Sequence, residues 1–439
     1  MPPRGVLEVI PPAGPVDGGI RLDGGKHAFA HALACAALAD EGTLYHAPDH
    51  IDARALRAGL GLVFARVEYD PVHRTLSFGE PRDTRVVRIH AELAARSRSL
   101  LCLYPALLAR ARELQVEAAP QGCEIGPRPT GWYIRTLQKF GVVAEETAGE
   151  LRLSWSQRRP AEIRFDYPTM TGTVIALAAA AAAPGTSTIA NGSAEPSCAD
   201  ELDCLATMGA RVEMSPHLMT VESPGRFASV RWSVPHDRIH AVTYLTAGLL
   251  VGGRVTVTGT GPLRIPRFIE FLQATGCRVI ESESSLTAQP PETGPLQPVR
   301  LEVGSEPLFS SDWAPMAALL LSLRTAGRSE LVDDVFPERF QYLDVLRTRG
   351  MAPFRLDGIV TETGRRAVRA RIDGRPGSSL RAGALPTVPD IRGSAAIALA
   401  ALAADGPSRV VDDFHIRRGY TDFAGDLRSL GLAVTRTAE

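Results

Sequence analysis

The sequence predicts an α/β protein assembled from six copies of one structural unit. Two observations carry this prediction. First, an Ala- and Leu-rich helical segment, a Gly-containing turn and a short β-rich run recur along the chain in that order. Second, another helical segment follows and ends at a glycine, after which a strand pattern resumes. Helices that alternate with strands around buried apolar segments are typical of the α/β class.

The first half of the unit occurs six times, and one copy is degenerate. The turn glycines Gly185, Gly253, Gly327 and Gly406 recur at intervals of about 70 residues, which is too long for a solenoid repeat and suits two helices with four strands. The copies, given as helix and following strand, are 32–38 and 43–46 (with Gly42 in the turn), 100–109 and 114–118 (degenerate), 174–183 and 186–189, 242–250 and 255–257, 316–323 and 329–332, and 395–403 and 408–411.

The second helix of the unit ends at a glycine that can adopt the left-handed conformation of a helix C-terminus. Residues with strand character follow each time, so a strand is expected there. These glycines are Gly141, Gly209, Gly276, Gly350 and Gly431.

Length, charge and cysteine usage define the broad class of the protein. A chain of 439 residues is too long for one ordinary core, so two or more domains are expected. A net charge of −1 gives no reason to expect nucleic acid or a membrane as partner, and no obligate protein partner is indicated. The most apolar stretch, 174–183, is too short for a membrane span. The first residues lack the apolar core of a signal peptide and the six cysteines form no CxxC pair, so we expect a cytoplasmic protein with reduced thiols.

Several of the first helices begin with cations. Lys26, one of only two lysines in the chain, precedes the first helical run, Arg96 and Arg98 precede the degenerate one, and Arg392 precedes the last. A helix N-terminus is already positive, so cations held there indicate that an anion binds through side chains and N–H groups together. Phosphate and carboxylate are the expected anions. Hydroxyl and acidic residues at other helix starts serve as N-caps: Thr171, Thr173, Asp237, Ser310, Ser311, Asp312 and Asp390.

Cys123 differs from the other cysteines in its surroundings. Residues 120–129 are rich in Gly and Pro and therefore predict a loop. Nearby Arg128 favours the thiolate form of Cys123. Most of the other cysteines are expected in the core, because Cys35 and Cys102 lie inside apolar helical runs. We therefore interpret Cys123 as a reactive residue, either a nucleophile or an acid.

Six motifs, in the same order, resemble those of the enolpyruvyl transferases, in particular the UDP-N-acetylglucosamine enolpyruvyl transferase branch. Residues 22–28 (LDGGKHA) are similar to the family's Ser-Gly-Ala-Lys-Asn-Ala. Residues 122–129 (GCEIGPRP) resemble its catalytic loop, Gly-Cys-x-Ile-Gly-Ala-Arg-Pro. The other four motifs are 309–312 (FSSD), 335–340 (VFPERF), 390–394 (DIRGS) and 415–420 (HIRRGY). The resemblance covers nearly the whole chain.

This resemblance implies the enolpyruvyl transferase fold, a two-domain inside-out α/β barrel with three repeat units in each domain. The first domain would span 21–234 and carry the Cys123 loop. The second would comprise 1–20 plus 235–439, with the active site in the cleft between the two domains.

The resemblance also implies roles for individual residues in a reaction of phosphoenolpyruvate. Cys123 would donate the proton to C3 of the enol, and Asp312 would act as general base for the acceptor hydroxyl. A tetrahedral intermediate would then lose phosphate, with no metal or organic cofactor. One of Arg96 and Arg98 fills a further Arg position, and the local alignment does not choose between them. The residues implied for catalysis are Lys26, Cys123, Asp312 and Arg392, and those for phosphoenolpyruvate binding also include Arg128, Arg339 and Arg418.

The acceptor half departs from the family pattern in three places. The family's Lys-Asn pair reads Lys26-His27, and its Arg-Pro-Val-Asp at the uracil end reads Arg-Pro-Thr-Gly at 128–131. The Lys-Val-Ser-Val-Gly segment that grips a diphosphate reads Pro-Thr-Met-Thr-Gly at 168–172, so its cation is missing. These changes suggest a smaller or less charged acceptor. The implied acceptor-binding residues are His27, Arg128, Pro129, Thr130, Thr169, Thr171, Gly172, Asp312 and Phe336.

Our hypothesis from the sequence is a divergent member that transfers the enolpyruvyl group to the 3′-hydroxyl of UMP, a reaction the family performs in nucleoside-antibiotic pathways. The competing hypothesis is the peptidoglycan step on UDP-N-acetylglucosamine. A third is an inactive relative that binds a nucleotide, against which the retention of Lys26, Cys123, Asp312, Arg339 and Arg392 argues. The resemblance at Cys123 also predicts alkylation by fosfomycin.

Overall fold

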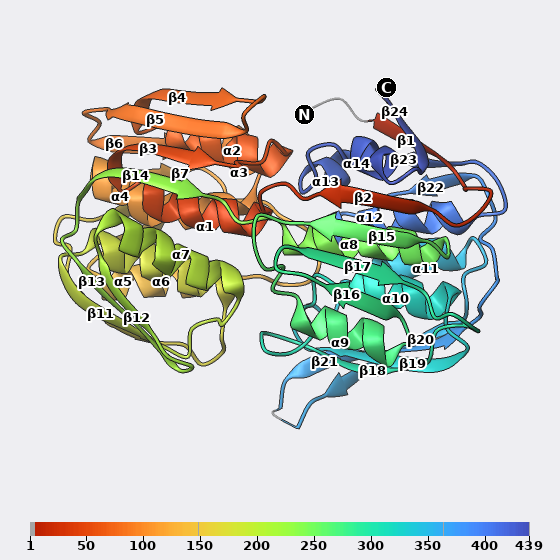
Figure 1. Ribbon diagram of the computed structural model, residues 1–439. Coiled ribbons are helices and arrows are strands. Elements are labelled where there is room, and N and C mark those ends of the chain that lie inside the picture. Colours follow the sequence, from red (N-terminus) through yellow and green to blue (C-terminus); the bar gives the residue numbers. More distant parts are fainter. Residues whose placement is uncertain (1–4, 148, 363, 439) are drawn as a thin grey trace. The chain divides into compact units, whose positions relative to one another are not determined.

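The computed structural model describes residues 5–147, 149–362 and 364–438. Contacts within the chain divide it into two compact units (Figure 1). The first unit comprises Asp23–Gly122 and Arg128–Pro235, and the second comprises Met1–Leu22, Cys123–Pro127 and His236–Glu439. The two segments of the first unit therefore alternate along the chain with the three segments of the second.

The Cys123 loop does not group as the predicted boundaries place it. The sequence puts this loop in the first domain, but the structure groups Cys123–Pro127 with the second unit. The Glu124 N–H donates to the Pro389 carbonyl at 2.8 Å, and Gln341 Nε2 donates to the Glu124 carbonyl at 3.1 Å. These long-range bonds hold the loop to the second unit, and neighbouring sequence gives no sign of them.

The first unit contains three four-stranded sheets among the described residues, ordered β14-β3-β5-β4, β6-β7-β9-β8 and β10-β11-β13-β12. Its elements are α1 (Lys26–Ala36), β3 (Ala39–Tyr45), α2 (Ile51–Leu60), β4 (Phe64–Asp70), β5 (Thr75–Pro81), β6 (Val86–Ile89), α3 (Ala91–Ala94), η1 (Arg98–Leu103), α4 (Tyr104–Ala111), β7 (Glu113–Val116), α5 (Gly131–Lys139), β8 (Val143–Thr147), β9 (Glu150–Ser154), β10 (Glu162–Arg164), α6 (Met170–Ala182), β11 (Gly185–Ala190), α7 (Pro196–Met208), β12 (Arg211–Met214), β13 (Leu218–Ser223) and β14 (Phe227–Ser233).

The second unit likewise has three four-stranded sheets over the residues described, ordered β22-β23-β1-β24, β16-β17-β15-β2 and β18-β19-β21-β20. Its elements are β1 (Gly5–Ile10), β2 (Asp17–Arg21), α8 (Arg238–Leu250), β15 (Arg254–Thr258), α9 (Pro266–Ala274), β16 (Arg278–Glu281), β17 (Ser285–Gln289), β18 (Arg300–Val303), α10 (Ala314–Leu323), β19 (Gly327–Asp333), α11 (Gln341–Arg347), β20 (Phe354–Val360), β21 (Arg366–Gly374), β22 (Ala384–Pro386), α12 (Ile391–Ala400), η2 (Ala401–Ala403), β23 (Ser408–Val411), α13 (Phe414–Arg417), α14 (Phe423–Ser429) and β24 (Ala433–Ala438).

All six sheets share one topology, which confirms the predicted repeat of two helices and four strands. In each, one parallel pair at an edge is followed by two antiparallel pairs, as in β10 and β11, β11 and β13, and β13 and β12. Three sheets are completed by strands from a distant part of the chain. β14 pairs with β3, β1 pairs with β23 and β24, and β2 pairs with β15. Parallel neighbours need a crossover connection, and a buried helix supplies it where the paired strands follow one another along the chain, as α6 does between β10 and β11.

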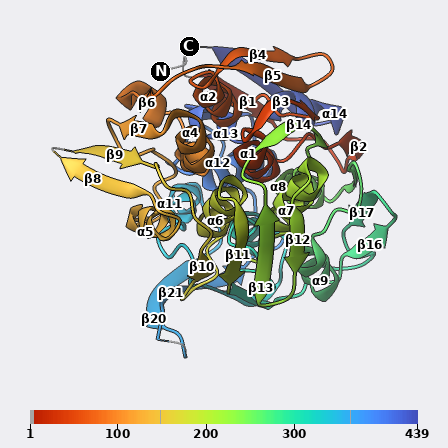
Figure 2. The same cartoon turned by 90° about the vertical axis from the view of Figure 1, so that its left-hand side faces the viewer.

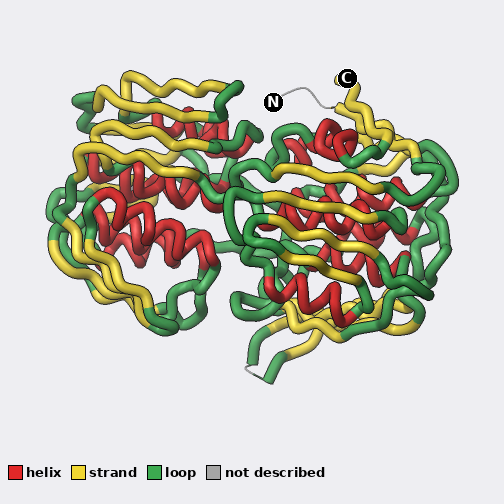
Figure 3. Tube along the Cα trace, in the orientation of Figure 1, coloured by secondary structure: helices red, strands yellow, loops and turns green. Residues whose placement is uncertain are grey.

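Three helices in each unit lie inside the sheets, as Figure 2 shows for α1, α4 and α6 and Figure 3 shows for the strands that cover them. These three helices contact one another, and so do α8, α10 and α12. Every residue from Val174 to Ala183 is fully buried. A helix that is apolar on all sides must be covered on all sides, so the sheets lie outside and the expected inside-out arrangement is confirmed. No helix in the described part of the chain is both long and apolar enough to span a bilayer.

The glycines confirm the predicted helix ends but correct one predicted turn. Gly209, Gly276 and Gly431 follow second helices with φ of 107°, 89° and 83°. Gly42, in contrast, lies inside β3 and not in a turn before a strand. A Cβ there would lie 2.3 Å from the Phe78 ring, so the residue is glycine because a neighbouring strand's aromatic ring packs against its Cα.

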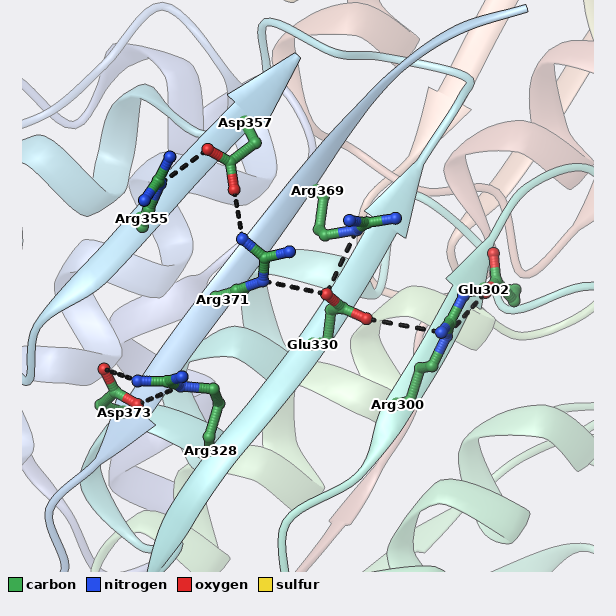
Figure 4. Close-up of polar contacts among 9 residues, drawn as sticks. All are labelled: Arg300, Glu302, Arg328, Glu330, Arg355, Asp357, Arg369, Arg371 and Asp373. Atoms are coloured by element: carbon green, nitrogen blue, oxygen red, sulfur yellow. Dashed lines mark hydrogen bonds and ion pairs between the residues drawn. The ribbon is translucent and has the colours of Figure 1, made fainter. Parts of the chain in front are cut away.

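The outer face of the β18-β19-β21-β20 sheet carries a network of opposite charges (Figure 4). Glu330 lies at its centre, 3.2 Å from Arg371 and from Arg369 and 3.6 Å from Arg300. Arg328 pairs with Asp373 on the neighbouring strand at 2.6 Å. Exposed pairs of this kind each add little to stability, about 0–1 kcal/mol, but they favour one strand register and keep this face in water.

Most cysteines lie in the core as predicted, and four surround a buried carboxyl group. Glu201 in α7 is fully buried, and Cys35 Sγ lies 3.0 Å from its Oε1. Burial raises the pKa of Glu201 well above its ordinary value, and the pKa of Cys35 is raised by burial and by Glu201. Burial therefore favours the protonated form of Glu201 in the folded protein. The other thiols whose pKa values burial and Glu201 raise are Cys102, Cys198 and Cys204.

The substitution Glu201→Gln should make stability less sensitive to rising pH. The folded pKa of Glu201 is raised, so its favourable contribution is fully present below the ordinary value of 4.5 and is lost as pH rises towards the folded pKa. We expect the difference in unfolding free energy, variant minus parent, to increase as pH rises from 5 to 7, by at most about 1.4 kcal/mol per pH unit. Denaturant titrations at several pH values measure this gap. The exposed control Glu213→Gln should show no such gain, and a gap independent of pH for Glu201→Gln would contradict a buried proton.

Candidate functional site

The predicted residues of the second unit gather around a buried arginine. Arg339, 5% exposed, forms an ion pair with Asp312 at 2.7 Å and lies 3.7 Å from Asp390. Burial lowers the pKa of Arg339, but Asp312 and Asp390 outweigh it and raise that pKa above its ordinary value. The guanidinium is therefore always charged, and it joins the carboxylates that precede α10 and α12.

A turn after β19 holds Arg339 in this position. Asp333 accepts hydrogen bonds from the Val335 and Phe336 N–H groups at 2.8 and 3.0 Å. Its other oxygen accepts from Ser311 Oγ at 2.5 Å, and Arg339 Nη1 lies 3.2 Å from the same hydroxyl. The Arg339 guanidinium stacks 4.6 Å above the Phe336 ring centroid. Phe336 thus contacts Arg339, whereas the resemblance implied a role in acceptor binding.

Cys123 lies at the N-terminus of α12. The Ile391 N–H points at Cys123 Sγ over 3.5 Å, and the sulfur is close enough to Arg339 to interact with its charge. A helix N-terminus and a guanidinium both favour negative charge on sulfur. All six cysteines lie in the part of the chain that the structure describes. Cys123 is partly exposed, and the other five are buried. The sulfur can therefore exchange a proton with a bound molecule.

Arg392, in the first turn of α12, and Arg418, the C-cap of α13, are both buried cations. Arg392 is 2% exposed, and its Nη1 has no hydrogen-bond partner among the described residues. Burial lowers the pKa of Arg392, but Tyr420, Asp312 and Asp237 raise it above its ordinary value, so the group stays charged. Asp390 caps α12 by accepting from the Gly393 N–H at 2.9 Å. A buried cation with an unused N–H can bind an anion.

The first unit holds Lys26 in a buried ion pair. Lys26 is the first residue of α1, and its Nζ lies 2.6 Å from Asp52 Oδ2. Asp52 itself lies in the first turn of α2, whose N-cap is His50. The carboxylate fixes the ammonium at the start of α1, where the helix dipole alone would repel it.

His27 follows Lys26 and stacks on His31. The two rings are nearly parallel, with centroids 6.2 Å apart. Burial and His27 together lower the pKa of His31 to about 3, so His31 is neutral at physiological pH. Its Nδ1 is buried without a hydrogen-bond partner in the described part of the chain. The His27 ring therefore packs against the uncharged ring of His31, one turn later in α1.

The structure separates the two candidate arginines before α4. Arg98 Nη2 donates to the Arg128 carbonyl at 2.6 Å, and the Arg98 side chain packs against Gly122. Arg96 is exposed. Arg98 is thus the member of the pair that lies beside Arg128 and the start of the Cys123 loop, a point that the local alignment left open.

The N-terminus of α6 carries the predicted hydroxyl residues. Thr169 is the N-cap, and its hydroxyl accepts from the Gly172 N–H at 3.3 Å. The Thr173 N–H bonds to the Thr169 carbonyl. The N–H groups of Met170 and Thr171 are the ones that an α-helix leaves for an external acceptor. Two further predicted acceptor-binding residues lie at the start of α5: Pro129 is exposed, and Thr130, the N-cap of α5, is half-buried.

Sequence reasoning missed three polar residues that support these groups. Asp52, Asp333 and Tyr420 contact Lys26, Ser311 and Arg392 respectively. Asp52 looks like an ordinary acidic residue in the first turn of a helix, and Asp333 like the end of a strand. Among the described residues, no three His, Cys, Asp or Glu side chains are arranged to hold a metal ion.

Comparison with known proteins places these observations in a family. A family model described as EPSP synthase (3-phosphoshikimate 1-carboxyvinyltransferase) matches residues 10–427. A UDP-N-acetylglucosamine 1-carboxyvinyltransferase of Symbiobacterium thermophilum is 32% identical over 427 residues, which cover 96% of this chain and 93% of that protein. Another protein of that name, from Mycobacterium leprae, is 31% identical over 428 residues, which cover 96% of each chain.

Comparisons with solved structures agree with these sequence matches. The enolpyruvyl transferase NikO from Streptomyces tendae superimposes with a TM-score of 0.83 at 25% identity, and the match covers all of both chains. An EPSP synthase from Acinetobacter baumannii gives a TM-score of 0.71 at 15% identity over 99% of this chain and all of that chain, which supports the fold alone. Because the family model and these relatives match nearly the whole chain, the protein belongs to the EPSP synthase family of enolpyruvyl transferases, which use phosphoenolpyruvate.

Proposed function

We propose that this enolpyruvyl transferase transfers the enolpyruvyl group of phosphoenolpyruvate to the 3′-hydroxyl of UMP. The observation that carries the choice of acceptor is the N-terminus of α6. The family resemblance expects a lysine before this helix, and Pro168 stands there. The Thr169 hydroxyl is already engaged as the N-cap, so the helix offers the N–H groups of Met170 and Thr171. Two N–H groups without a lysine suit a single phosphate better than a diphosphate.

The buried cations suit the donor. Phosphoenolpyruvate carries a phosphate and a carboxylate, and the buried guanidiniums of Arg339, Arg392 and Arg418 in the second unit can neutralise them. Lys26, in the first unit, is a further buried cation that the family resemblance assigns to the donor. Arg98 takes the remaining arginine role instead of Arg96, because Arg98 lies beside Arg128.

The reaction needs one proton donor and one proton acceptor. Cys123 gives its proton to C3 of the enol, which leaves C2 electron-poor. The acceptor hydroxyl attacks C2 as Asp312, ion-paired with Arg339 at 2.7 Å, accepts the hydroxyl proton. The Cys123 thiolate then takes a proton back from C3 of the resulting tetrahedral intermediate. The C2–O bond to phosphate breaks, and the departing phosphate takes the proton from Asp312, which gives the enol ether and inorganic phosphate and restores both side chains. Each positioned acid or base of this kind contributes about 10²–10⁴-fold.

His27 also supports a changed acceptor. In Asn the acceptor and the donor lie side by side on one planar amide, so both can pair with the amide of an N-acetyl sugar. The two ring nitrogens of His27 point in different directions, and its ring is stacked on His31. The imidazole is bulkier than an amide and is better suited to a ribose or phosphate than to an N-acetyl group.

UDP-N-acetylglucosamine is the alternative acceptor, and the names of the curated relatives favour it. Those relatives are about 30% identical to this chain, a level at which the donor half can persist while the acceptor half changes.

An acceptor panel decides between the two. We expect phosphate release from phosphoenolpyruvate with UMP and not with UDP-N-acetylglucosamine, because the α6 N-terminus lacks the diphosphate cation. 3′-Deoxy-UMP is the matched control, since it can bind but has no hydroxyl to attack. Release with UDP-N-acetylglucosamine alone would overturn the proposal, and release with neither acceptor would favour the inactive relative.

The substitution Pro168→Lys should shift selectivity towards UDP-N-acetylglucosamine. A lysine there restores a charge-assisted contact to a second phosphate, and we expect kcat/KM for UDP-N-acetylglucosamine to rise about tenfold relative to that for UMP. Steady-state kinetics with both acceptors measure the ratio. Pro168→Ala removes the proline without adding charge and should leave the ratio unchanged. If Pro168→Lys and Pro168→Ala have the same ratio of kcat/KM for the two acceptors, the residue at position 168 does not contact the second phosphate.

The substitution Cys123→Ala should lower kcat by about 10²–10⁴-fold, because it removes the proton donor. Cys277→Ala, at a buried thiol of the same unit, should keep parental turnover. We also expect fosfomycin to add once to the parent and to Cys277→Ala, but not to Cys123→Ala, in intact-mass spectra. Full turnover by Cys123→Ala would refute the acid role, whatever the alkylation result.

A further inference from the structure

The main chain of Glu124, the residue after Cys123, is hydrogen-bonded on both sides within the second unit. Its N–H donates to the Pro389 carbonyl at 2.8 Å, and its carbonyl accepts from Gln341 Nε2 at 3.1 Å. The sulfur of Cys123 lies 3.5 Å from the Ile391 nitrogen, at the start of α12. The position of the sulfur therefore depends on how the main chain of Glu124 is oriented.

Burial and hydrogen bonding do different things in this loop. Ile125 is 2% exposed, so its side chain anchors the loop through the hydrophobic effect. That attraction has no preferred direction, and it does not fix how the neighbouring main chain is turned. Hydrogen bonds weaken steeply as they bend, so the two bonds at Glu124 fix its orientation.

The Gln341 side chain comes from the turn that also holds Arg339. Gln341 is the first residue of α11, and Arg339 lies two residues before it. Arg339 forms the ion pair with Asp312, the proposed base, at 2.7 Å. Asp333 fixes the beginning of the turn by accepting hydrogen bonds from two N–H groups that follow it. The short segment 333–341 thus contacts both the proposed base and the residue next to the proposed acid.

We propose that Gln341 is a positioning residue, which holds the main chain at Glu124 so that the Cys123 sulfur stays at the N-terminus of α12. The segment 333–341 then fixes the proton donor and the proton acceptor relative to each other, the first through Gln341 and the second through Arg339. The inference rests on the proposed roles of Cys123 and Asp312. It adds a residue to which the proposed mechanism gives no part.

The substitution Gln341→Met tests the inference. Methionine has nearly the same length as glutamine but has no N–H to donate. The loss of one hydrogen bond should lower kcat about 2–10-fold, and the KM values for phosphoenolpyruvate and for the acceptor should stay parental, because no proposed binding group changes. Gln341→Glu, whose carboxylate cannot donate either, should lower kcat at least as much. A parental kcat in both variants, with or without a raised KM, would overturn the inference.

The assay follows phosphate release with whichever of UMP and UDP-N-acetylglucosamine supports turnover, so its outcome does not depend on the choice of acceptor. A matched control separates positioning from general stability. Gln273 is an exposed glutamine of α9 in the same unit, and Gln273→Met should leave kcat and both KM values unchanged. If Gln273→Met lowers kcat as much as Gln341→Met does, the effect is not specific to the Cys123 loop and the inference fails.

A double-mutant cycle with Cys123→Ala distinguishes the inference from the proposed function. If Gln341 acts through Cys123, Gln341→Met should lower the residual kcat of Cys123→Ala by less than about twofold. Additive losses would overturn the inference while leaving the role of Cys123 standing. Full turnover by Cys123→Ala would instead overturn the acid role on which the inference rests.

Discussion

Burial of three apolar helices inside three sheets is the constraint on which each unit of this protein depends. In the second unit, α8, α10 and α12 contact one another, and Asp237 and Asp312, at the starts of α8 and α10, both raise the pKa of Arg392 at the start of α12. The helices cannot move independently because sheets cover them on the outside. Packing thus places three helix starts together, and these starts carry residues of the candidate site.

The same packing explains why buried cations persist there. Arg339 and Arg392 would be costly to bury alone, and Asp312, Asp390, Asp237 and Tyr420 offset that cost. In the first unit, Asp52 likewise offsets the cost of burying Lys26. Each cation is held by a neighbour, so its side chain is already fixed in one position.

Much of the site could be predicted from residue type and position. Lys26 and Arg392 stand at helix starts, where a cation is unfavourable without an anion, and Cys123 stands in a Gly- and Pro-rich loop. Residues that act through another residue gave no such sign. Asp52 reads as a helix-start acid, and Asp333 as the end of a strand. Their partners, Lys26 and Ser311, are far away in the sequence.

The sequence by itself determined the repeated unit, the helix ends and the cations at helix starts, because periodicity, glycine and local charge are properties of short segments. Tertiary structure alone decided the rest. It chose Arg98 over Arg96 as the neighbour of Arg128, joined the Cys123 loop to the second unit, and bonded the Tyr420 hydroxyl to Thr243 in α8. These outcomes depend on hydrogen bonds between residues distant in the chain, which only packing of the whole unit brings within reach.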